Sequence, residues 1–229
     1  MRKVLIGLAA TAGALALAGQ AGAVTFVASG TGGDGAESAK AVLTTSGHTL
    51  DVALSSLIAN PKAAGQEVSD IEITFANSPG VVTFQSDSQN FVTITRHKKA
   101  ANTWTTSTGA TTHWGVATSS DTVTLATAGP GSVGGKPIDL IIGNSGSFSN
   151  ANPSITGRNP QILGTGNFDL MFSGAVPKIS SVVFSFGTGP DNFLPGQALV
   201  PEPASWALMM MGAGLIGGAL RRRRKLAAA

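Results

Sequence analysis

A glycine-rich segment near the amino end, Gly30-Thr31-Gly32-Gly33-Asp34-Gly35, has the spacing of a phosphate-binding loop. In dinucleotide-binding proteins such a loop follows a strand, opens a helix and precedes a second strand that ends in an acidic residue. The residues that follow here lack that alternation of strands and helices, so we interpret the segment as a flexible glycine turn. Asp34 is one candidate calcium ligand, and a single copy of the segment leaves calcium binding open.

The three histidines, His48, His97 and His113, have neither the His-x-x-x-His nor the Glu-x-x-His spacing of a metal site. The chain has no cysteine, which excludes disulfides, thiolate nucleophiles and cysteine-ligated zinc. It also lacks the Gly-x-Ser-x-Gly elbow of a serine hydrolase. The two carboxylates of a glycosidase are paired in space and not in sequence, so a hydrolase acting on polysaccharide stays an alternative. We predict a protein without a catalytic site, metal or cofactor.

Trp104 and Trp114 stand in a threonine-rich segment that offers another kind of surface. Exposed aromatic rings beside hydroxyl groups suit contact with sugar rings, because the ring supplies an apolar face and the hydroxyls supply hydrogen bonds. The sequence therefore makes Trp104 and Trp114 candidate glycan contacts. The alternative is that both tryptophans pack in or over a hydrophobic core.

Charge is concentrated at the two ends of the chain, where seven of the fifteen lysines and arginines lie. Between Val24 and Leu199, eight cations and eleven anions leave a charge of −3. Nucleic-acid binding requires basic residues clustered on one face, and Arg96-His97-Lys98-Lys99 is a single short run. We interpret that run as a solvated turn or as a charged guard of an edge strand, and we expect no nucleic-acid partner.

Ten short segments of β-branched and aromatic residues recur between turns rich in glycine and polar residues. Several alternate between apolar and polar residues, as in sheets packed on one side. The pattern predicts an all-β domain, an antiparallel β-sandwich of jelly-roll or immunoglobulin-like type. A short helix is indicated only near residues 54–59, and residues 128–136 and 143–166 are predicted loops. The predicted strands are residues 24–28, 39–44, 49–54, 71–76, 81–85, 91–95, 122–127, 138–142, 168–173 and 179–186.

Residues 1–23 have the features of a cleavable export signal. Arg2 and Lys3 precede the apolar run 4–18, which predicts a signal helix, and the small residues Ala21 and Ala23 mark the cleavage site. The exported domain is therefore expected to comprise residues 24–199.

Residues 200–229 have the features of a sorting tail. Residues 204–220 carry no charge, and at about 1.5 Å per residue a helix of this length covers roughly 25 Å, enough to span a thinned bilayer. Five cations follow and resist translocation, so the tail is predicted to be a single transmembrane helix in membrane lipid with its basic end in the cytoplasm. These topology residues are Arg221, Arg222, Arg223, Arg224 and Lys225.

The motif 201–207 precedes this helix and carries Pro201, Glu202, Pro203, Trp206 and Ala207. The two prolines hold the tripeptide extended, the conformation in which proteases bind their substrates. Together with the glycines and arginines that follow, the motif resembles a PEP-CTERM sorting signal of the PEPxxWA kind. The resemblance implies export by a bacterium with an outer membrane and recognition by exosortase, an integral-membrane cysteine protease that removes the tail.

These observations predict an exported, non-enzymatic bacterial protein of the cell surface or extracellular matrix, with exosortase, membrane lipid and exopolysaccharide as partners. Two alternatives stay open: a permanently anchored single-span protein of the inner membrane and a secreted hydrolase that acts on polysaccharide.

Overall fold

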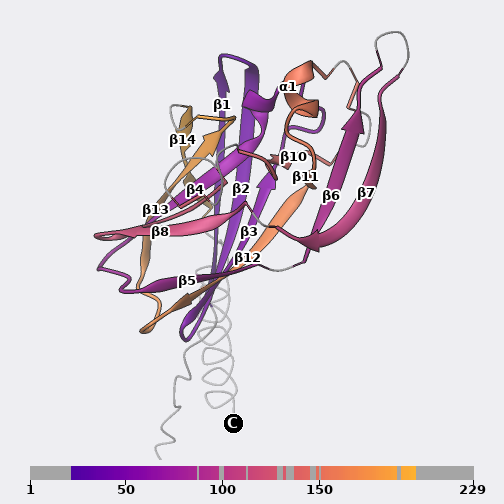
Figure 1. Cartoon of the computed structure of the whole chain (residues 1–229). Coiled ribbons are helices and arrows are strands. Elements are labelled where there is room, and N and C mark those ends of the chain that lie inside the picture. The colour runs from indigo at the N-terminus through magenta and orange to yellow at the C-terminus, as the bar shows by residue number, and fades with distance from the viewer. Residues whose placement is uncertain are drawn as a thin grey trace, which may run out of the picture.

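The computed structural model describes residues 22–86, 88–97, 101–111, 113–127, 131–132, 137–144, 148–149, 151–189 and 192–199. They form two β-sheets packed against each other (Figure 1). The prediction of a nearly all-β body is confirmed. No helix among these residues is long and apolar enough to cross a bilayer. The predicted signal helix and the predicted transmembrane helix at residues 204–220 lie outside the described residues.

The first sheet has six antiparallel strands in the order β15-β1-β2-β3-β12-β5. Two-residue turns connect β1 to β2 at Gly33-Asp34 and β2 to β3 at Gly47-His48. The first turn lies in the middle of the glycine-rich segment, whose other residues belong to β1 and β2, so the interpretation as a turn is confirmed for Gly33 and Asp34. The strands are β1 (Gly22–Gly32), β2 (Gly35–Ser46), β3 (Thr49–Ser56), β5 (Val82–Ser86), β12 (Thr165–Phe172) and β15 (Gln197–Leu199).

The second sheet follows the order β14-β13-β4-β10-β11-β6-β7, and the β8-β9 hairpin adds to it through β9, which pairs with β4. Its strands are β4 (Val68–Phe75), β6 (Ser88–Thr95), β7 (Thr103–Ala110), β8 (Gly115–Ser119), β9 (Thr122–Ala126), β10 (Ile141–Ile142), β11 (Gln161–Leu163), β13 (Ile179–Phe186) and β14 (Phe193–Pro195).

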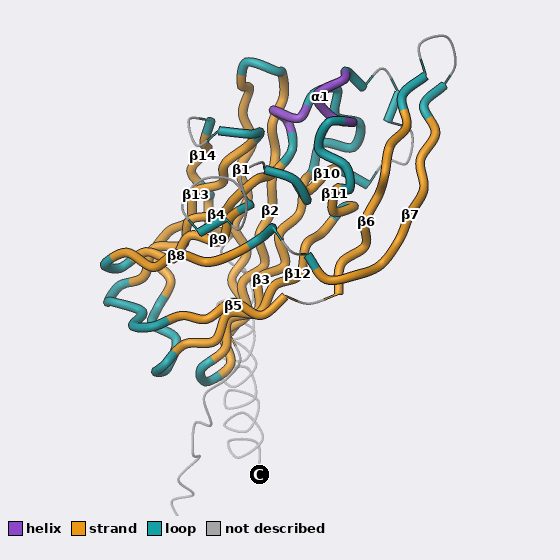
Figure 2. The backbone as a smooth tube through the Cα atoms, viewed as in Figure 1, coloured by secondary structure: helices purple, strands orange, loops and turns teal. Residues whose placement is uncertain are grey.

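One parallel pair, β10 with β11, makes the second sheet mixed, so the predicted antiparallel arrangement is confirmed for the first sheet but not throughout the second. Parallel neighbours need a crossover connection, and here the crossover carries the short helix α1 (Pro153–Thr156). The predicted loop at residues 143–166 therefore holds α1, β11 and the start of β12. Figure 2 shows how little helix accompanies the strands.

The main core lies between the sheets and is built from alternating positions of facing strands. From the first sheet come Leu43, Leu50 and Leu54, and from the second Ile71 and Phe184, all fully buried. Burying each such side chain contributes about 1.5–3 kcal/mol. A smaller cluster lies outside this core, against β6, and consists of Val92, Ile94, Ile142, Phe148, Ala151 and Ile155.

The last two strands join the sheets at one edge. β14 pairs with β13 of the second sheet, and after Gly196 the chain continues as β15, which pairs with β1 of the first sheet. A Cβ at Gly196 would lie 2.9 Å from side-chain atoms of both Phe184 and Val182. Only glycine therefore fits at this crossing between the sheets.

Each of the ten predicted strand segments contains strand residues, although within 138–142 only Ile141 and Ile142 are in a strand. Strands β7, β8, β11, β14 and β15 were not predicted. The helix expected at residues 54–59 was wrong, because Ser55 and Ser56 continue β3 and pair with Thr165 of β12 and Ala39 of β2. The helical turns lie elsewhere, at α1 and at the 3-10 turn η1 (Ala64–Gln66).

Candidate binding pocket and chain ends

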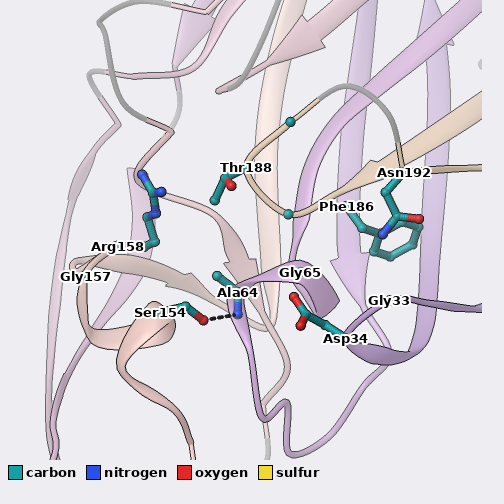
Figure 3. A pocket seen from close by; sticks show the side chains of 12 residues that line it. Gly33, Asp34, Ala64, Gly65, Ser154, Gly157, Arg158, Phe186, Thr188 and Asn192 are labelled. Carbon is teal, nitrogen blue, oxygen red and sulfur yellow. Dashed lines mark hydrogen bonds between the residues drawn. The ribbon is translucent and has the colours of Figure 1, made fainter.

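An open pocket of about 800 Å³ lies at the end of the sandwich where β1 turns into β2 (Figure 3). Its side chains that can form hydrogen bonds are Asp34, Ser154, Arg158, Thr188 and Asn192. Five glycines complete much of the wall: Gly33, Gly65, Gly157, Gly187 and Gly189. Backbone groups are thus accessible between a few polar side chains, which suits a hydrophilic ligand.

The pocket is assembled from turns that are far apart in the sequence. Asp34 comes from the β1-β2 turn, Gly65 from η1 and Thr188 from the turn after β13. Ser154 Oγ accepts a hydrogen bond from the Ala64 amide at 2.9 Å and thereby ties α1 to η1. The walls of the pocket are thus turns that extend from strands of both sheets.

Gly187 lines the pocket and is held in place by its backbone. Its amide donates to the carbonyl oxygen of Glu67 at 2.8 Å, and its φ of +81° is one that residues with a Cβ rarely adopt. A Cβ at this position would lie 3.0 Å from the Cα of Gly65. Glycine is therefore required by both conformation and space.

Opposite charges stand apart in the pocket. Figure 3 shows the Asp34 carboxylate beside Gly65 and the Arg158 side chain on the far side, near Thr188. Arg158 Nη1 donates to the carbonyl oxygen of Pro137 at 3.2 Å. No ion pair is found between Asp34 and Arg158, and the contact of His113 with the Asp139 carboxylate lies elsewhere. Asp34 and Arg158 therefore keep hydrogen-bonding capacity for a ligand.

Two buried glutamates support the pocket from behind. Glu37, 1% exposed, accepts a hydrogen bond from Asn192 Nδ2 and so orients a pocket side chain. Glu67 accepts from Gln161 Nε2 at 3.0 Å through both carboxylate oxygens. Burial raises the pKa of Glu67 well above its usual range, although the Gln161 hydrogen bond and the Arg158 charge oppose the shift. Glu67 is fully buried, so its role is to connect the residue between η1 and β4 with Gln161 of β11.

The polar groups of the pocket match a polyhydroxyl ligand, because a carboxylate accepts from hydroxyls while guanidinium and amide groups donate to them. Within the described part of the chain, no group of three or more histidine, aspartate and glutamate side chains is placed to hold a metal ion. Asp34 is accordingly one carboxylate in a polar pocket. The sequence singled out Asp34 but not Arg158, Ser154 or Asn192, because nothing in their spacing shows that they meet.

The two tryptophans have different environments. Trp114 is 1% exposed, its Nε1 donates to the Asp139 carbonyl oxygen at 2.8 Å, and its ring lies 4.6 Å from that of Phe168. The prediction of a glycan contact is wrong for Trp114, since a buried ring offers no face to a sugar, and the core alternative is confirmed. Trp104 on β7 is 43% exposed and meets Phe148 edge-on at 5.8 Å, so its glycan contact stays a prediction.

The histidines lie in three separate places. His113 Nδ1 is 3.0 Å from Asp139 Oδ2, which also accepts a 2.6 Å hydrogen bond from Thr111. His48 lies in the β2-β3 turn, and His97 contacts Thr103 Oγ1 at 3.0 Å where β6 turns into β7. The exposure of Arg96 and His97 agrees with the predicted solvated turn.

The two ends of the domain lie side by side. β1 begins at Gly22 and β15 ends at Leu199, and the antiparallel register pairs Thr25 with Leu199. Gly22 and Ala23, the last two residues of the predicted signal peptide 1–23, are exposed in β1 and pair with Thr45 and Thr44. Outside the described residues lie Ala21, the motif residues Pro201, Glu202, Pro203, Trp206 and Ala207, and the cations 221–225.

Comparison with known proteins bears on this carboxyl end. Residues 199–224 match the family model of the PEP-CTERM protein-sorting motif. A search of the curated proteins finds no match to the chain. The motif supports export to the surface or the extracellular space, with exosortase as the processing partner. The chain thus carries a PEP-CTERM sorting motif that begins at the last residue of its last described strand.

Proposed function

We propose that this protein is a non-enzymatic component of the bacterial surface or its polysaccharide matrix, whose tail is removed by exosortase after export. The sorting motif at residues 199–224 is the observation that carries the proposal. The motif continues directly from β15, so recognition takes place within a few residues of the folded domain.

The geometry of the domain supports different roles for its two ends, with the sorting tail at one end and the pocket at the other. β1 starts beside the exit of the tail and ends at the pocket turn, Gly33-Asp34. Its eleven residues span about 36 Å at roughly 3.3 Å each. A tail held in the membrane would thus leave the pocket on the side away from the bilayer. There the pocket would contact exopolysaccharide.

Replacement of Pro201, Glu202 and Pro203 by alanine tests processing. A pulse-chase should show the precursor accumulating with its tail attached and delivery to the surface falling, whereas replacing Pro177, in the loop before β13, should change neither. Unchanged delivery of the motif variant would favour a permanently anchored single-span protein. Turnover of matrix polysaccharide that is lost when a single Asp or Glu is replaced would establish the hydrolase alternative.

A further inference from the structure

Strand β7 is the longest edge strand among the described residues. It has eight residues, against five in β5 and β8 and three in β14 and β15. Its only described partner strand is β6, so the backbone groups on its other side are not paired within the described part of the chain. In Figure 1, β7 forms the outer side of a curved hairpin.

β7 lacks the features that protect most edge strands from pairing with another chain. Natural edges are kept short or carry charges, prolines or bulges. β14 is short and ends in Pro195, but Thr-Trp-Thr-Thr-Ser-Thr-Gly-Ala of β7 contains no charge and no proline. Its four threonines and one tryptophan favour the extended conformation.

The hairpin already holds β7 in an extended conformation. Eight consecutive pairs join it to β6, from Ser88 with Ala110 to Thr95 with Thr103. β6 is fixed in turn by Val92 and Ile94, which are buried against Phe148 and Ile155. A strand that adds to this edge therefore meets an ordered template, and less conformational entropy is lost on pairing.

We propose that β7 is a self-association edge, at which β7 of a second copy of this chain adds as an antiparallel strand around a two-fold axis at one of its four central residues, 105–108. Around a two-fold axis, each residue of β7 faces either the same residue or another β7 residue of the second copy. Because β7 has no charged residue, no like charges oppose each other across this interface.

The basic turn between β6 and β7 favours the antiparallel orientation. Parallel pairing would bring Arg96 and His97 of the two copies to the same end of the interface. Antiparallel pairing separates them by about one strand length, roughly 27 Å, which exceeds the Debye length of about 8 Å at physiological ionic strength. Charge thus selects one orientation for two identical strands.

Single cysteines provide the test, because the chain has none of its own. Thr105, Thr106, Ser107 and Thr108 are replaced by cysteine one at a time in the full-length protein in mild detergent, with Thr83→Cys on β5 and Thr118→Cys on β8 as controls. Only the residue on the two-fold axis approaches its own copy within disulfide range, since a residue one position away is already more than about 7 Å from its copy.

One of the four positions should therefore form the disulfide-linked dimer at least about tenfold faster than the controls and the other three positions. Comparable fast cross-linking at all four positions would indicate parallel in-register pairing and overturn the proposal. Cross-linking at the control rate at all four positions would show that β7 does not pair with itself.

Lysine substitutions give an independent measurement. Thr106→Lys and Thr108→Lys should each weaken concentration-dependent dimerisation at least about tenfold in sedimentation, while Thr83→Lys should not. Equal dimerisation of all three variants would contradict the proposal. If β7 instead binds an extended peptide of another protein or a glycan chain, purified protein stays monomeric at all concentrations. Neither result depends on whether the tail is processed.

Discussion

Thr25 and Leu199 lie opposite each other in the antiparallel pair of β1 and β15. Leu199 is also the first residue that matches the sorting motif. A protease needs several extended residues in its cleft, and here those residues adjoin a paired strand. β15 has three residues, all exposed, so its detachment from β1 disrupts little packing.

Locking β15 to β1 should slow removal of the tail. The variant Val27→Cys/Gln197→Cys places a disulfide between residues that face each other across the two strands. We expect the oxidised protein to retain its tail in a pulse-chase and reduction to restore processing, because β15 can then separate. Val42→Cys/Ala53→Cys, a facing pair between β2 and β3, is the matched control. Equal processing of both variants would mean that β15 need not detach.

The two tryptophans should differ in their effect on stability. Trp114→Ala removes a buried ring and its hydrogen bond to Asp139, so the free energy of unfolding should fall by about 3–5 kcal/mol. Trp104→Ala removes a half-exposed ring with one aromatic contact and should cost about 1 kcal/mol. Urea titration followed by far-UV circular dichroism measures both. Similar losses for the two variants would contradict the assigned environments.

Asp70 should make the stability depend on pH. Burial raises the pKa of Asp70 to about 6, and nearby Glu72 adds to the shift while a hydrogen bond from Ser185 opposes it. Between pH 4 and 6 the folded state binds a proton at Asp70 that the unfolded state, with a pKa of about 3.9, has released. The stabilisation is complete below pH 4 and is lost as the pH rises through 6.

Asp70→Asn removes this titration. The free energy of unfolding of the natural protein should fall relative to that of Asp70→Asn by on the order of 2 kcal/mol between pH 4 and 7. Denaturant titrations at several pH values measure the difference, and Glu67 contributes equally to both proteins. Asp121→Asn, in the exposed β8-β9 turn, is the control. A constant difference across this range would show that Asp70 is ionised throughout.

The pocket should bind matrix polysaccharide through Asp34 and Arg158. Asp34→Asn and Arg158→Gln should each weaken binding at least about tenfold, because a hydrogen bond to a charged group contributes about 1.5–3 kcal/mol. Calorimetry with exopolysaccharide fragments measures the affinity, and Lys178→Gln, outside the pocket, should leave it unchanged. If Trp104→Ala weakens binding and the pocket variants do not, the glycan contact lies on β7.

The sequence predicts the sandwich best where apolar and polar residues alternate. Ile71 and Ile73 of β4 show this pattern, and both are fully buried. β7 was not predicted from the sequence. Both of its faces are exposed, so its residues do not alternate between apolar and polar types. β10 and β11 are two and three residues long, and their parallel pairing depends on a crossover whose glycines and asparagines have the composition of a loop.

The pocket was harder to predict than the strands. Asp34 drew attention through the glycines around it, but Arg158 and Asn192 reach the pocket only because distant turns converge at one end of the sandwich. Helix α1 was not predicted, although Asn152 before Pro153 caps it and accepts a hydrogen bond from the Ser154 amide at 2.8 Å. A cap locates a helix, but not the turns against which it packs.

Asn192 borders the pocket and Leu199 is the first residue of the sorting motif, so one run of eight residues along the edge of the sandwich connects the two. If the protein is tethered by its carboxyl end while a ligand holds the opposite end, tension acts along the strands. β14 and β15 are then loaded in shear, in which neighbouring backbone hydrogen bonds must rupture together. Such a domain resists detachment from a surface when tension acts along its strands. β15 can nevertheless separate from β1 one hydrogen bond at a time, starting at its carboxyl end.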